Sequence, residues 1–182
     1  MLKRILQDGF RTFFLLAALW AAFAMIIWES WLVAQAFGGV PLIRSLSMAP
    51  HQWHGHEMIF GYGAAAVAGF LLTALSREQR GFIAIAALLW VAGRGAFWWS
   101  ASLSPWLVAA LALAFLPFLG GQLLIRVLRR RTPQHFVFLL FVAALMVGNI
   151  LTHLGLSGFV SDGFDTGQRL GLFALCSLIA IL

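Results

Sequence analysis

Long apolar runs recur along this chain, with short polar segments between them, and they constrain the fold more than any other feature. A helix needs roughly 20 apolar residues to cross the hydrocarbon core of a bilayer. The expected spans are residues 13–37, 54–75, 81–100, 104–128 and 135–156, with an incomplete span over 170–182. We therefore expect one membrane domain over 1–182, an all-α polytopic transmembrane helical bundle with five full spans and a truncated sixth.

Composition supports a lipid environment. Hydrophobic residues make up 62% of the chain and charged residues 10%, whereas about 25% of a soluble domain is charged. The net charge of +6 comes from bases in short loops, so we expect contact with the lipid bilayer and none with nucleic acid. The single cysteine, Cys176, excludes a disulfide framework and a thiolate cluster. Any metal must be held mainly by histidine, methionine or oxygen.

The distribution of Lys and Arg predicts the orientation in the membrane. With a cytoplasmic N-terminus, nine bases lie inside and two outside: Lys3, Arg4, Arg11, Arg77, Arg80, Arg126, Arg129, Arg130 and Arg131 against Arg44 and Arg169. This asymmetry satisfies the positive-inside rule. Six tryptophans fall at the outer ends of the spans, as in an aromatic belt: Trp28, Trp31, Trp53, Trp98, Trp99 and Trp106. A signal peptide is the alternative for the first run, because residues 34–36 (AQA) resemble a cleavage site.

A histidine cluster opens the second span, where three of the five histidines lie within six positions. Ionisable groups at a membrane face are costly to desolvate and usually serve a function. Imidazole nitrogen and thioether sulfur both bind copper or iron. The candidate metal ligands are therefore His51, His54, His56 and Met58. Interfacial hydrogen bonding and a proton relay remain the alternatives for this cluster.

Other polar residues are expected at the same depth. Arg94 lies in the outer half of the third span, so we expect it to be buried in protein and to need an anion. That anion could be Glu29, Glu57 or a haem propionate. Asn149 and His153 lie near the outer end of the fifth span. The candidate cofactor-binding residues are His54, His56, His153 and Arg94, and the candidate supporting or proton-relay residues are Glu29, Glu57 and Asn149.

Small residues recur every four positions from Gly61 to Gly69, which predicts a seam for close helix approach. At α-helical spacing, His54 and Met58 fall on this seam and should point into the bundle. His56 lies on a different side of the same helix. A histidine of this span could pair with His153, or His51 with His54.

A family resemblance emerges from these residues. The run Trp53-His54-Gly55-His56-Glu57-Met58-Ile59-Phe60-Gly61-Tyr62 resembles the signature of the NnrS family, and residues 9–17, 68–74, 88–94 and 149–153 extend the resemblance. It implies a bacterial inner-membrane protein that binds haem and copper in the response to nitric oxide and nitrosative stress, often alongside denitrification. The resemblance carries this role to His54, His56 and Glu57, and less firmly to His153.

The resemblance also implies further helices and histidines beyond Leu182. We therefore expect this sequence to be an N-terminal half, with a site completed by a C-terminal half or a homo-oligomer. The expected function is haem and copper binding near the periplasmic face in protection against nitric oxide, without a defined catalytic reaction. The alternatives are a haem-copper redox enzyme acting on nitric oxide or quinol, with Glu57 or Glu29 delivering protons, and a transporter of metal or haem.

Overall fold

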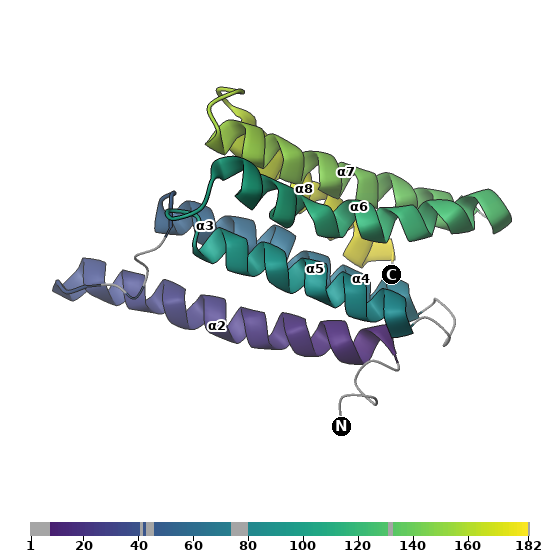
Figure 1. The fold of residues 1–182 in the computed structure, drawn as a ribbon, viewed down its shortest axis with the longest axis horizontal. Coiled ribbons are helices and arrows are strands. Elements are labelled where there is room, and N and C mark those ends of the chain that lie inside the picture. Colours follow the sequence, from purple (N-terminus) through teal and green to yellow (C-terminus); the bar gives the residue numbers. More distant parts are fainter. Residues whose placement is uncertain (1–7, 41, 43–45, 74–79, 131–132, 182) are drawn as a thin grey trace.

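The computed structural model describes residues 8–40, 42, 46–73, 80–130 and 133–181 (Figure 1). This part of the chain forms helices and no strand. The elements are α2 (Gly9–Phe37), α3 (Pro50–His56), the π-helix η1 (Glu57–Gly63), α4 (Ala64–Thr73), α5 (Arg80–Trp98), α6 (Pro105–Arg130), α7 (Pro133–Leu156) and α8 (Gly163–Ile181). The predicted all-α polytopic bundle is confirmed.

Five single helices are long and apolar enough to cross a membrane: α2, α5, α6, α7 and α8. The predicted second span corresponds to α3, η1 and α4, which follow one another without a break from Pro50 to Thr73. Its expected last residues, 74 and 75, lie outside the described residues. Chain direction reverses between successive spans, and α2 packs on α4 and η1 while α6 packs on α5 and α7 (Figure 1).

The structure corrects the start of the last helix. We expected a loop up to Gln168 and a span from Leu170, whereas α8 already begins at Gly163. Glycine disfavours a helix in isolation, but here the glycines form the face that packs on α7. A Cβ added at Gly148 of α7 would lie 2.8 Å from the backbone of Gly167 and of Gly171. Close packing of small residues therefore outweighs their low helix propensity.

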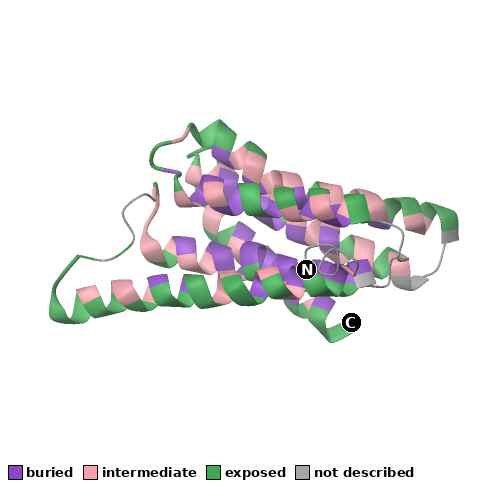
Figure 2. Cartoon of the chain, turned by 60° about the horizontal axis from the view of Figure 1, so that its bottom comes forward, coloured by how far each residue is buried: buried purple, intermediate pink, exposed green. Residues whose placement is uncertain are grey.

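The surface and interior divide as expected for a protein in lipid. Figure 2 shows buried residues on the sides of helices that face one another, and exposed residues on the outward sides. Many outward side chains are large and apolar, including Leu19, Ile26, Leu88 and Leu128, each more than 60% exposed. A water-soluble monomer rarely exposes so much apolar surface. These side chains can instead contact lipid tails.

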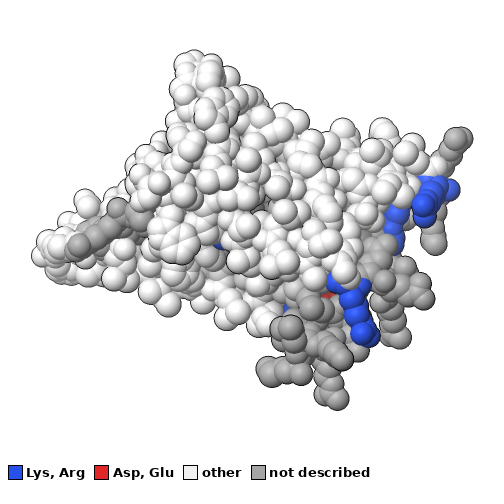
Figure 3. Space-filling model, viewed as in Figure 1, with Lys and Arg blue, Asp and Glu red and all other residues white. Residues whose placement is uncertain are grey.

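Basic residues gather at one end of the bundle, where α2 and α5 begin and α6 ends (Figure 3). Arg11, Arg80, Arg126 and Arg129 belong to this end. Arg11 forms an exposed ion pair with Asp8, with 3.1 Å between nitrogen and oxygen. The other predicted inner bases, Lys3, Arg4, Arg77 and Arg131, and the outer Arg44 lie outside the described residues.

The α7–α8 contact predicts a position-specific cost for one added methyl group. In Gly148→Ala the new Cβ would meet the α8 backbone, which cannot move aside as a side chain can, so we expect a loss of about 1–3 kcal/mol. The matched control is Gly121→Ala in α6, where an added Cβ meets nothing within 4 Å, and higher helix propensity should make it neutral or stabilising. Thermal unfolding in detergent, followed by circular dichroism, measures both. Equal stability of the two variants would contradict the close α7–α8 packing.

Candidate functional site

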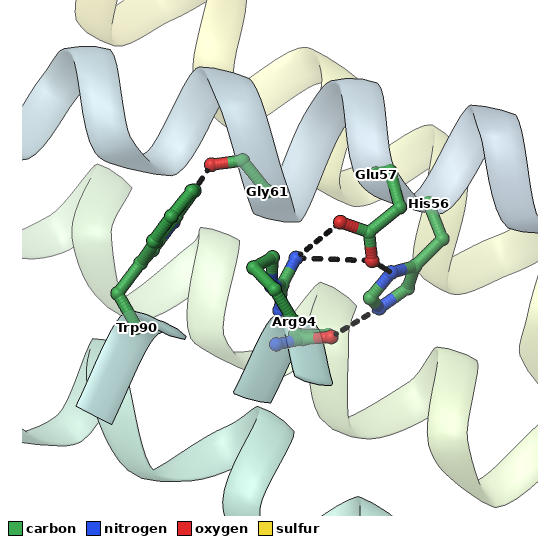
Figure 4. Close-up of polar contacts among 6 residues, drawn as sticks. His56, Glu57, Gly61, Trp90 and Arg94 are labelled. Atoms are coloured by element: carbon green, nitrogen blue, oxygen red, sulfur yellow. Dashed lines mark hydrogen bonds and ion pairs between the residues drawn. The ribbon is translucent and has the colours of Figure 1, made fainter. Parts of the chain in front are cut away.

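A buried ion pair lies at the centre of the polar layer. Nη1 of Arg94 on α5 donates hydrogen bonds to both carboxylate oxygens of Glu57 on η1, at 3.1 and 2.9 Å (Figure 4). Glu57 is fully buried and Arg94 is 4% exposed. The expectation that Arg94 is buried in protein is therefore confirmed. Its anion is Glu57, whereas the other candidate, Glu29, is exposed on α2.

The His56 imidazole extends this pair to a third helix. Its Nδ1 lies 3.1 Å from Oε1 of Glu57, and its Nε2 lies 3.0 Å from Oδ1 of Asn149 on α7 (Figure 4). The ring also stacks on Phe97 of α5, with centroids 4.1 Å apart. Asn149 therefore orients an imidazole, as expected from the sequence. Both ring nitrogens of His56 already have partners, which leaves neither for a metal in this arrangement.

The π-helix explains why His56 takes the buried position. We expected His54 on the inner seam by α-helical spacing, but His56 is fully buried and His54 only partly. In a π-helix, residues five apart are aligned. His56 is five residues before Gly61, so the wider turns of η1 bring its side of the helix toward the bundle interior.

Gly61 allows the ion pair to lie directly against η1. A Cβ at this position would come within 2.6 Å of Oε2 of Glu57 and 2.8 Å of Nη1 of Arg94. Trp90 of α5 donates a hydrogen bond from Nε1 to the Gly61 carbonyl, at 3.0 Å (Figure 4). Glycine at position 61 is thus required for the close approach of α5 and η1, in agreement with the predicted seam.

His153 lies beside this network with an unused nitrogen. It is 6% exposed, and its ring is 5.7 Å from that of His56, centroid to centroid, in an edge-on arrangement. Its Nε2 is buried without a hydrogen-bond partner. The side chain lines a cavity of about 130 Å³ together with Met48, Ser100 and Ser157. The structure thus brings together His56 and His153, as one of the two predicted histidine pairs requires.

The other candidates lie outside this network. His54 stacks on Trp28 of α2, with ring centroids 4.6 Å apart, and its Nδ1 is buried without a partner. His51 is exposed. Met58 packs against the apolar cluster around Trp53. The predicted pairing of His51 with His54 is not among the contacts that the structure shows.

Sequence reasoning missed three aromatic residues of the site. Phe97 and Trp90 lie among apolar residues in α5, and nothing in their spacing indicates that one stacks on His56 and the other binds a backbone carbonyl. Trp20 gives a clearer signal, because it lies in the middle of an apolar run and not at its end. Its indole nitrogen is buried, without a partner, and lies 3.0 Å from the position of a Cβ on Gly61.

The comparison with protein families identifies the chain. The family model described as NnrS protein matches residues 4–182. The chain belongs to the NnrS family. No curated protein and no solved structure matches it. Membership supports a membrane protein of the nitric oxide response, and the WHGHEMIFGY run lies at the centre of the buried network.

The two cofactors associated with the NnrS family fit these residues differently. A porphyrin does not fit around His56 and His153, because His56 has no unused nitrogen and the cavity of about 130 Å³ is smaller than typical ligand pockets of roughly 300–1,000 Å³. A single metal ion fits the donors better, since imidazole and thioether both suit copper. The described residues contain no ready-made group of three or more His, Cys, Asp or Glu ligands.

The ion pair of this NnrS-family chain predicts strong coupling between Glu57 and Arg94. Removing either partner leaves the other charge buried and unpaired, which costs about 3–5 kcal/mol. We expect Glu57→Leu and Arg94→Met each to lower the free energy of unfolding by this amount. The double variant should lose much less than the sum of the single losses. Unfolding of the four proteins in detergent measures the coupling, and additive losses would contradict it.

Proposed function

We propose that this chain binds copper or haem at the outer face of a bacterial inner membrane and thereby protects against nitric oxide. One observation carries the proposal: the buried, unpartnered Nε2 of His153, which lies on a small cavity. A buried polar atom without a partner is costly, so such an atom usually has a ligand. Family membership supports the same conclusion.

Copper suits the His153 cavity better than haem does. Met48 lines the same cavity and adds a soft sulfur donor, which favours Cu(I). His56 packs edge-on against His153, and its own hydrogen bonds to Glu57 and Asn149 hold it in place. The network would thus orient the ligand and exclude water, while bound copper would supply an open coordination position for nitric oxide.

Haem would have to use a different histidine. His54 is only partly buried and retains an unpartnered Nδ1, so a large planar group could approach it from the edge of the bundle. Glu29 lies close enough to interact electrostatically with this imidazole. We assign His54 as the candidate axial ligand for haem and His153 as the candidate ligand for copper.

The proposal predicts separate losses of the two metals. We expect His153→Ala to lose copper from the purified protein and His54→Ala to lose haem. His51→Ala is the matched control, because His51 is exposed and belongs to the same histidine cluster. Metal analysis and absorption spectra of oxidised and dithionite-reduced protein measure both cofactors. Copper content unchanged by His153→Ala in a folded protein would overturn the copper assignment.

The proposed orientation has its own test. We propose that the basic end faces the cytoplasm and that the α5–α6 connection faces the periplasm, as the positive-inside rule requires. In a Cys176→Ala background, Ser102→Cys in that connection should react with a membrane-impermeant maleimide in intact cells whose outer membrane has been permeabilised. Gly81→Cys at the basic end should react only after lysis. Both residues are exposed, and the reverse pattern would contradict the orientation.

A further inference from the structure

A second cavity lies apart from the His153 cavity, between α2 and α5. Its volume is about 440 Å³, within the range of small-molecule sites. Trp20 of α2 and Trp90, Arg94 and Trp98 of α5 line it. These helices run side by side along the same face of the bundle (Figure 1). The crevice is almost entirely apolar, apart from the few groups that can form hydrogen bonds.

Two hydrogen-bond donors at this crevice have no partner. Nε of Arg94 and Nε1 of Trp20 are both buried without an acceptor, and Arg94 as a whole is 4% exposed. Nη1 of Arg94 and Nε1 of Trp20 both come within 3.0 Å of one point, the position of a Cβ on Gly61. Leaving a buried donor unsatisfied costs about 1–3 kcal/mol. The two donors therefore call for an acceptor atom from a ligand.

The charges of the site indicate a neutral acceptor. Glu57 already balances the Arg94 guanidinium through two hydrogen bonds, so a second buried carboxylate would be left without a counter-charge. Such an uncompensated charge is strongly unfavourable in a dry site. A carbonyl oxygen accepts the same hydrogen bonds without this cost. A fatty-acid carboxylate and a haem propionate are disfavoured for the same reason.

The lining also excludes a ligated haem and favours a flat organic ring. No His, Met or Cys lines the crevice, so no side chain there can coordinate a haem iron. Indole faces stack well on planar rings. Around the crevice Leu19, Val91 and Trp99 are 61%, 48% and 57% exposed on the lipid-facing surface. A ligand can thus come from the bilayer and keep an apolar tail there.

We propose that this crevice binds a membrane-soluble quinone. One ring carbonyl accepts hydrogen bonds from Trp20 and Arg94, the ring packs on the tryptophan faces, and the tail extends into lipid. The proposal concerns binding alone and does not depend on the proposed copper or haem site. It goes beyond the nitric oxide function because it assigns a different ligand class to different residues.

The test is calorimetric titration of the detergent-purified chain with decylubiquinone, a quinone with a short tail. We expect saturable binding of one quinone per chain. Trp20→Phe keeps the ring but removes the N–H donor, and should weaken affinity by roughly fivefold or more, as loss of one hydrogen bond does. Gly95→Leu should block binding, because Gly95 lines the crevice and has room for a first added atom. Trp106→Phe is the matched control, since Trp106 is exposed and outside the crevice.

Further arms separate the possible explanations. All variants must elute as single species and unfold at the wild-type temperature, and the conservative Trp20→Phe keeps the test valid if Gly95→Leu fails to fold. Oleate that binds as tightly as the quinone and displaces it would overturn the proposal in favour of an unspecific lipid groove. Unchanged quinone affinity in Trp20→Phe would overturn it too. His153→Ala should bind quinone normally, so failure of the copper proposal is distinguishable from failure of this one.

Discussion

The structure depends on one buried ion pair in a bundle that is otherwise almost wholly apolar. Glu57 and Arg94 are each costly to remove from water, and the cost is bearable only because they neutralise one another. Glu57 also holds His56, which reaches Asn149 on α7. The pair therefore links η1, α5 and α7 through directional contacts. Apolar packing alone provides little such direction between helices in lipid.

The π-helix and Gly61 make this pair possible. The wider turns of η1 rotate His56 inward, while the missing side chain at Gly61 lets Arg94 lie close to the helix axis. A π-helix has poorer hydrogen-bond geometry than an α-helix and often marks a functional position. Trp90 offsets part of this cost through its hydrogen bond to the Gly61 carbonyl. Local backbone strain and buried charge thus coincide at one place in the second span.

Hydropathy and charge predicted the spans well, because lipid imposes helix length and forbids unpaired backbone groups. The same reasoning predicted a buried Arg94 that needs an anion. It left three candidates open, since depth in the membrane does not identify the partner. It placed His54 inward because α-helical spacing cannot anticipate a π-turn. It also missed the first turns of α8, where contacts with α7 outweigh the composition of a glycine-rich segment.

The ion pair also separates two compartments. On one side, Arg94 lines the tryptophan-rich crevice between α2 and α5. On the other, His56 carries the hydrogen bonds of Glu57 toward His153 and its smaller cavity. A ligand in either compartment meets the same buried charges, which act strongly in a low-dielectric interior. Any change in charge at one cavity must therefore alter the electrostatic environment of the other, without any movement of the helices.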